Sequence, residues 1–84
     1  MAEALTFAAK QGVDPVKVRA ALLGGSAYSR ILEVHGQRML DRDFTPGFRS
    51  GLHQKDLGIV LNEAREKNVA LPVTSVAAQL LNAL

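Results

Sequence analysis

The chain has 84 residues, a formal net charge of +2 and no cysteine. Its apolar fraction of 48% is that of a globular protein, and its length allows one domain with a modest core. The lack of cysteine excludes a disulfide scaffold and a thiolate metal site, and it fits a cytoplasmic location. Basic and acidic residues are interspersed, without the concentrated basic face of a nucleic-acid binder. No apolar run approaches the about 18 residues of a membrane span.

The first predicted helix covers residues 1–11 and has Leu5, Ala8 and Ala9 on one side. It ends at Gly12, the residue type that most often follows a helix C-terminus. No Ser, Thr, Asp or Asn stands before it as a cap. We therefore expect this helix to be the end of a longer one and the chain to be a fragment, with a frayed terminus as the alternative.

A second helix is predicted from the stretch "VDPVKVRAALLGG". Asp14 is placed to cap it, and Pro15 occupies the first helical position, where its missing N–H costs nothing. Gly24 and Gly25 end it. Its predicted buried stripe consists of Val18, Ala21 and Leu22.

A third helix is predicted over residues 27–41, with Ser26 as its cap. Helical spacing aligns five residues on one face: Tyr28, Ile31, Leu32, His35 and Met39. Within this stripe His35 is expected to be a partly buried, hydrogen-bonded histidine, in preference to a chemical role. Gly36 weakens the helix by about 1 kcal/mol relative to Ala, so we expect another helix to approach it closely.

Residues 42–49 form a predicted loop, because Pro46 and Gly47 make a turn. A fourth helix follows over residues 50–67, and Pro72 opens a fifth. The predicted core stripe of the fourth helix is Leu57, Val60, Leu61 and Ala64. That of the fifth is Val73, Val76, Ala77, Leu80 and Leu84. Because no strand signal is comparably strong, we predict an all-α bundle of about five helices.

The candidate site is the loop with the start of the helix that follows it. The turn brings Phe48 near that start as an apolar wall, and helix N-termini suit anionic ligands. Lys55 can donate hydrogen bonds there, while Asp56 can orient it or a hydroxyl. One of the two is expected at the edge of the core and the other near it, and the alternative for them is an ordinary surface charge pair. His53 is expected to approach Asp56 or Leu57, and no set of residues predicts a metal site.

These residues carry a resemblance to a known family. The stretch "DRDFTPGFRSGLHQKDLGIVL" resembles the C-terminal domain of the β-hydroxyacid (3-hydroxyisobutyrate) dehydrogenase family, with its F-x-P-G-F segment and following K-D-L. The stretches "AEALTFAAKQGVDPVKVRAALLGG" and "LPVTSVAAQLLNAL" are similar to the family's upstream run and to its usual ending. "ILEVHGQRMLDRDFTPGF" and "LHQKDL" resemble its tartronate semialdehyde reductase branch.

The resemblance implies the all-α C-terminal domain of a two-domain enzyme of the 6-phosphogluconate-dehydrogenase-like type. Such an enzyme uses NAD or NADP, which is bound mainly by an N-terminal Rossmann domain. That Rossmann domain of the parent enzyme is the expected partner of this chain. Lys55 corresponds to a lysine that contacts the cofactor, and Phe48 and Asp56 correspond to positions lining the substrate pocket. The family's catalytic lysine has no counterpart in these 84 residues, so we expect no catalytic residue and no activity from this chain alone.

Two other functions compete with this one. One is a stand-alone helical module for protein interaction or dimerisation, with no enzymatic parent. For the excised enzyme domain itself, apolar stripes left uncovered predict self-association into a homo-oligomer. A helical nucleic-acid module is disfavoured by the scattered charges, and it would bind with a steep dependence on salt.

Overall fold

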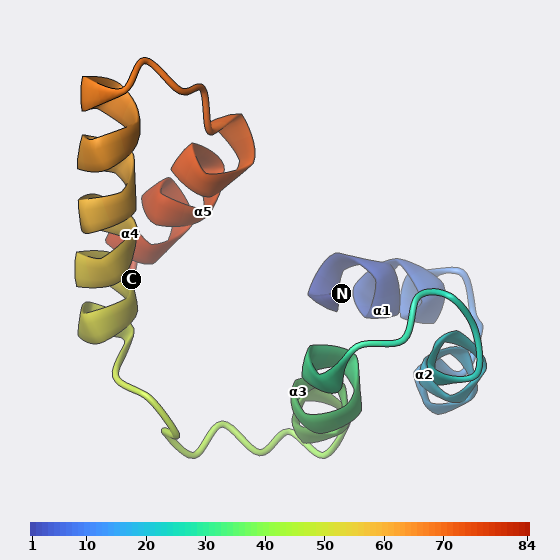
Figure 1. Cartoon of the computed structure of the whole chain (residues 1–84). Coiled ribbons are helices and arrows are strands. Elements are labelled where there is room, and N and C mark those ends of the chain that lie inside the picture. The colour runs from blue at the N-terminus through green and yellow to red at the C-terminus, as the bar shows by residue number, and fades with distance from the viewer. The chain divides into compact units, whose positions relative to one another are not determined.

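The computed structural model describes all residues from Met1 to Leu84. Its five helices are α1 (Ala2–Lys10), α2 (Pro15–Leu23), α3 (Arg30–Leu40), α4 (Ser50–Glu66) and α5 (Pro72–Asn82), and there is no strand (Figure 1). The prediction of an all-α chain with about five helices is confirmed. None of these helices combines the length and the apolarity that a membrane crossing needs.

The chain divides into two compact units, which we call the N-terminal unit (Met1–Thr45) and the C-terminal unit (Pro46–Leu84). The N-terminal unit contains α1, α2 and α3, and the C-terminal unit contains α4 and α5. The buried apolar side chains are Leu5 and Leu32 in the N-terminal unit and Ala64 in the C-terminal unit. The one-domain interpretation of residues 1–84 stays a prediction.

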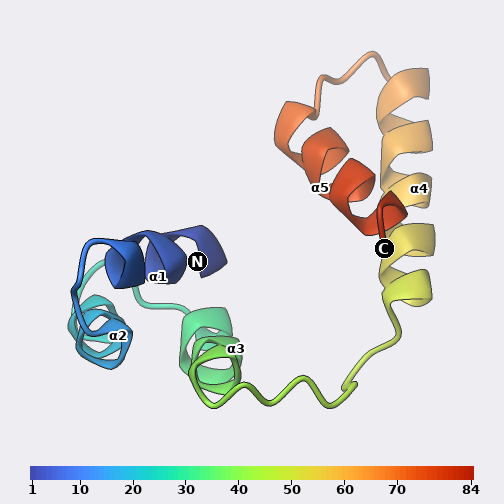
Figure 2. The same cartoon turned by 180° about the vertical axis from the view of Figure 1, so that it is seen from behind.

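In the N-terminal unit, α1 packs against α2, and α2 packs against α3 (Figure 2). Leu5 from α1 and Leu32 from α3 are its buried apolar side chains, with exposures of 6% and 4%. Several predicted core residues are half-buried around them: Ala8, Val18 and Leu22. Ala9 and Ala21 were predicted in the same stripes but are exposed, because each lies on the flank of its helix.

Local signals determine most helix ends in this unit. The Asp14 side chain accepts a hydrogen bond of 3.0 Å from the Val16 amide, which confirms it as the cap of α2. Gly12 has a φ of +80°, the left-handed conformation that ends α1. Ser26 was wrong as the cap of α3. The Tyr28 amide donates to the Gly25 carbonyl in a turn, so the helix begins later and Ser29 caps it.

Gly36 is buried against the side chain of Arg19, which confirms the predicted close approach at this glycine. A Cβ placed on Gly36 would lie 3.4 Å from Arg19 Cδ and 3.3 Å from Leu32 Cδ1. Arg19 Nη2 donates a 2.7 Å hydrogen bond to the Glu33 carbonyl, and Nε donates a 3.4 Å bond to the Leu32 carbonyl. The approaching group is therefore a guanidinium from α2 that holds α3 through its backbone.

This arrangement corrects the predicted stripe of α3. Four of its five members are exposed: Tyr28, Ile31, His35 and Met39. The helix packs through Leu32 and Gly36 because the missing side chain of the glycine leaves room for Arg19. Tyr28 precedes the helix, and its hydroxyl donates to Glu33 Oε2 at 3.0 Å. The expectation of a partly buried His35 was wrong for the same reason.

The C-terminal unit is a helical hairpin in which α4 and α5 pack side by side (Figures 1 and 2). Ala64 is buried in α4, with Leu57 and Leu61 half-buried beside it, as predicted. Val60, predicted in the same stripe, is 44% exposed. Near the end of the hairpin the Gln54 amide donates a 2.6 Å hydrogen bond to Asn82 Oδ1.

The prediction for the packed face of α5 was wrong. All five residues of the predicted stripe are exposed: Val73, Val76, Ala77, Leu80 and Leu84. The half-buried residues of α5 are Thr74, Ala78 and Leu81. The packed side of α5 therefore combines two small side chains with Leu81, while the predicted stripe lies outside. We call these five exposed residues, four in α5 and Leu84 just after it, the outer face of α5.

Candidate functional site

The predicted site segment spans the boundary between the two units. Phe44 and Thr45 end the N-terminal unit, and Pro46 begins the C-terminal unit. Within the C-terminal unit, an open cavity of about 560 Å³ lies at the start of α4. Its lining residues are Pro46, Phe48, Arg49, Ser50, Gly51 and Leu52. The cavity therefore combines an aromatic wall with the first turn of a 17-residue helix.

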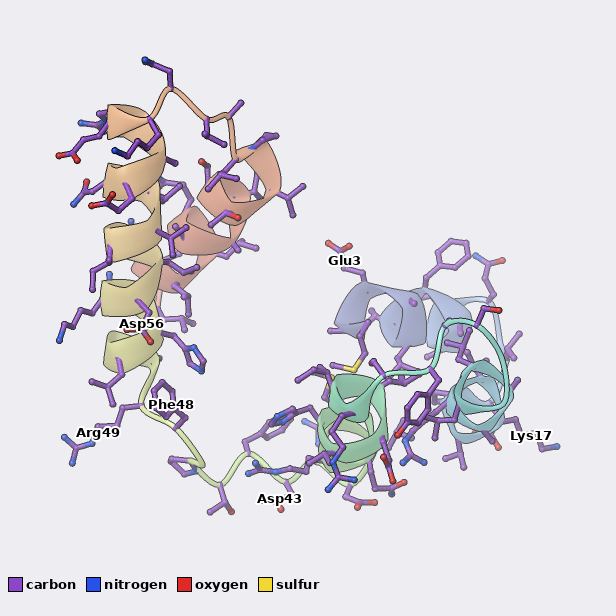
Figure 3. The ribbon with its side chains drawn as sticks, in the orientation of Figure 1. Glu3, Lys17, Asp43, Phe48, Arg49 and Asp56 are labelled. Carbon is purple, nitrogen blue, oxygen red and sulfur yellow. The ribbon has the colours of Figure 1, made fainter.

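The start of α4 carries positive charge that no side-chain cap offsets. Arg49 is the N-cap residue, and its side chain makes no capping hydrogen bond. The first amide to find a backbone partner is that of Leu52, which donates to the Arg49 carbonyl at 3.0 Å. The Ser50 and Gly51 amides precede it and face outward from the helix end, where the dipole favours anions. Arg49 is exposed, and Figure 3 shows its side chain extending away from α4.

Lys55 and Asp56 lie on the second turn of α4, beyond the lining of this cavity. Both are exposed, and Leu57, which follows Asp56, is half-buried. The expected place of this pair at the edge of the core stays a prediction. The two salt bridges of the chain join Arg30 to Glu33 and Arg38 to Asp43, so Lys55 and Asp56 do not pair with each other. Figure 3 shows Phe48 by the first turn and Asp56 on the next. Their roles stay predictions.

Sequence reasoning missed the contact of His53. Its ring packs against Phe48 in a T-shaped arrangement, with the centroids 4.4 Å apart and the planes at 67°. The expected approach to Asp56 or Leu57 overlooked this partner. Phe48 immediately precedes the N-cap residue Arg49, and His53 lies four residues after it. This is the spacing of a hydrophobic staple. That spacing is the signal that could have identified the pair.

A second cluster of polar groups lies at the C-terminal end of α3. Arg38 Nη2 donates to the Thr45 carbonyl, and Arg38 Nε lies 3.8 Å from Asp43 Oδ2. Asp43 Oδ1 accepts a 3.1 Å hydrogen bond from the Thr45 amide. An open cavity of about 230 Å³ beside the cluster includes His35 and Phe44 in its lining. The charges are used in fixing residues 43–45 to α3, so this cluster is structural. No group of three His, Asp or Glu side chains is placed to hold a metal ion.

Asp43 provides a test of this cluster. Hydrogen bonds from the Thr45 side chain and backbone amide lower the pKa of Asp43, and the charge of Arg38 lowers it further. A lowered carboxyl pKa stabilises the folded state above the ordinary value of about 3.9, and this contribution is lost as pH falls through the folded-state pKa.

We expect an NMR titration to give Asp43 a midpoint below the ordinary value, and Thr45→Val to raise that midpoint by removing the hydroxyl. Thr6→Val, on α1 of the same unit, should leave the midpoint where it was. A midpoint at or above the ordinary value in the unaltered chain would contradict the geometry.

Comparison with known proteins gives one family over the whole chain. The profile of a family described as "NAD-binding of NADP-dependent 3-hydroxyisobutyrate dehydrogenase" matches residues 1–84. The chain is 55% identical over 82 residues to 2-hydroxy-3-oxopropionate reductase of Escherichia coli, covering 98% of this chain and 28% of that protein. It is 42% identical over 80 residues to probable 3-hydroxyisobutyrate dehydrogenase-like 1, mitochondrial, of Arabidopsis thaliana, covering 95% and 24%.

A third relative is 2-(hydroxymethyl)glutarate dehydrogenase of Eubacterium barkeri, which is 35% identical over 81 residues, covering 95% of this chain and 27% of that protein. The chain thus spans about a quarter of the length of each of these three relatives. All three are named as reductases or dehydrogenases.

Proposed function

Because this chain belongs to the family of NAD-binding domains of NADP-dependent 3-hydroxyisobutyrate dehydrogenase, we propose that it forms the helical wall of the active site in an NAD(P)-dependent 3-hydroxyacid dehydrogenase or semialdehyde reductase. The likeness to 2-hydroxy-3-oxopropionate reductase supports tartronate semialdehyde as the substrate of that enzyme, with glycerate as the product. The chain itself has no group assigned to the chemical step.

The observation that carries this proposal is the composition of the start of α4. Phe48 gives a flat apolar surface, Ser50 and Gly51 present amides at the positive end of a helix, and Lys55 holds an exposed ammonium on the next turn. A dinucleotide has matching parts, namely a flat ring and anionic phosphates. The residues present therefore fit the binding of NAD or NADP.

Each residue has a distinct proposed task. Lys55 donates hydrogen bonds to the cofactor, as an ammonium with three donors can. Asp56, next to it, accepts hydrogen bonds and orders polar groups of the bound molecules. Phe48 lines the substrate side and excludes water from it. When bound, the nicotinamide supplies the hydride of the reduction, and the residues of this chain bind and orient.

We further propose two partners for this domain. A Rossmann domain would hold most of the cofactor and bring it to the start of α4. A second copy of the enzyme would contribute to a homo-oligomer through helical surfaces. What supports these partners is exposed apolar area, since Val73 and Leu80 on the outer face of α5 are 81% and 67% exposed. Such side chains are commonly covered in an assembly.

The role of Lys55 is tested by Lys55→Ala in the enzyme that carries this domain. We expect the KM for NAD(P)H to rise about 10-fold or more, because a hydrogen bond from a charged donor is worth about 1.5–3 kcal/mol. Lys55→Arg should retain part of the affinity. Steady-state kinetics with varied cofactor, supported by direct titration of cofactor binding, provide the measurement.

Lys67→Ala is the matched control, because Lys67 is exposed and directly follows α4. It should leave the kinetics unchanged. Equal cofactor affinity in Lys55→Ala and the unaltered enzyme would show the assignment to be wrong. That result would favour the alternative function, a helical module for protein interaction or dimerisation, for which the outer face of α5 is the supporting observation.

A further inference from the structure

The chain enters α4 without the usual device for fixing a helix start. No side chain caps this helix, because Arg49 occupies the N-cap position and has no acceptor group to offer the first amides. Gly47 comes just before Phe48, and it leaves the backbone there with wide conformational freedom. Phe48 itself is 53% exposed. The direction of the Phe48 ring must therefore be set by a specific neighbour.

That neighbour is His53. Its ring contacts Phe48 at a centroid separation of 4.4 Å, within the range for favourable edge-to-face aromatic pairs. The pair joins the residue before the N-cap to the first turn of α4, and such a staple fixes the angle at which the chain enters a helix. His53 is not among the residues that line the cavity, whereas Phe48 is. It can act on the cavity through Phe48.

We propose that His53 is a positioning residue, which holds the ring of Phe48 as the wall of the cavity at the start of α4. This inference rests on the proposed function, in which Phe48 lines the substrate side of the site. An aromatic pair of this kind shifts the population of the ordered ring roughly 2- to 10-fold. Loss of the pair should weaken binding of the small hydroxyaldehyde substrate by a similar factor and leave the chemical step almost unchanged.

The first experiment needs no ligand. In NMR spectra of this chain, nuclear Overhauser contacts should join the ring protons of Phe48 and His53. His53→Ala should abolish the ring-current shifts on Phe48, and His53→Phe should restore the packed ring. Gln54→Ala is the control, because it removes the hydrogen bond to Asn82 between α4 and α5 and should leave Phe48 unmoved.

The second experiment measures steady-state kinetics in the enzyme that carries this domain, with tartronate semialdehyde as substrate. We expect His53→Ala to raise its KM roughly 2- to 10-fold with kcat within about twofold, since an aromatic pair is worth about that factor in binding. His53→Phe should return the KM to that of the unaltered enzyme, and Gln54→Ala should not change it. A general loss of stability would lower the amount of folded enzyme and so the apparent kcat, whereas loss of the positioning role raises KM at nearly constant kcat.

The outcomes separate this inference from the proposed function. Persistence of the packed Phe48 ring in His53→Ala overturns the inference, and so does an unchanged KM after the packing is lost. If His53→Ala has no effect on KM while Lys55→Ala weakens cofactor binding, the positioning role is wrong and the proposed function stands. If neither substitution changes the kinetics, both are wrong.

Discussion

Leu32→Ala is expected to lower the free energy of unfolding of the N-terminal unit by about 2–4 kcal/mol. Leu32 is 4% exposed, the lowest value among the buried side chains, and it lies beside Gly36 where α3 meets α2. Truncation removes apolar contacts and leaves a cavity, because the surrounding helices relax only partly into the vacated space. A unit with only Leu5 as a second buried leucine has little else to compensate.

Ile31→Ala is a matched control, since Ile31 precedes Leu32 on the same helix and is 57% exposed. It should change the free energy of unfolding by no more than about 0.5 kcal/mol. Amide hydrogen exchange is the suitable measurement, because it reports the opening of α3 separately from that of α4 and α5. Equal effects of the two substitutions would show that α3 packs through a different face.

Arg19→Ala is expected to lower the stability of the same unit by about 1.5–3 kcal/mol, the range for hydrogen bonds from a charged donor. The Arg19 guanidinium donates to the carbonyls of Leu32 and Glu33, and its aliphatic part covers Gly36. Both contributions are lost together. Arg19→Lys should recover only part of the loss, because an ammonium lacks the planar fork that reaches two neighbouring carbonyls.

A double-mutant cycle with Gly36→Ala tests the same contact from the other helix. In the unaltered chain the new methyl group meets Arg19 Cδ at 3.4 Å, so crowding opposes the about 1 kcal/mol that Ala gains over Gly in a helix. After Arg19→Ala the crowding from Arg19 is gone and only that from Leu32 Cδ1 remains, so Gly36→Ala should be more favourable than before. Lys17→Ala, an exposed change on α2, is the control for loss of charge. Additive effects would contradict the contact.

Sequence patterns predicted the helices well where the signal was local. Asp14 with Pro15 fixed the start of α2, Gly12 ended α1, and Pro72 opened α5, each through a backbone requirement that depends on few neighbours. Gly36 was interpreted correctly as a place of close approach. The identity of the approaching group, a guanidinium, could not be predicted, because it depends on how two helices meet.

The wrong predictions concern which face of a helix is buried, not where the helices lie in the sequence. The outer face of α5 has helical spacing, but the residues that pack are Thr74, Ala78 and Leu81. Residues 68–84 contain no charged side chain, so no charged face marks the solvent side of this helix.

For α3 the spacing of large side chains predicted one packed face. The helix instead packs through Leu32 and Gly36, because the glycine leaves room for Arg19. Ser29, not Ser26, caps α3, because a turn that ends at Tyr28 makes the helix begin later.

The site was predicted in part. Phe48 lines the cavity at the start of α4, as its place after the Pro46–Gly47 turn indicated. The functional roles of Lys55 and Asp56 remain predictions that came from a family resemblance. The Phe48–His53 contact was not predicted, because the expected partners of His53, Asp56 and Leu57, lie further along α4, whereas its actual partner precedes the helix.

The two sides of α5 have different consequences for evolution. Thr74 and Ala78 hold the helix to α4, so replacements there are limited by the hairpin itself. Val73, Val76 and Leu80 are more than half exposed, so exchange among aliphatic residues at these positions should cost the hairpin little. One short helix thus combines a side that packing constrains with a side on which the hairpin itself places little constraint.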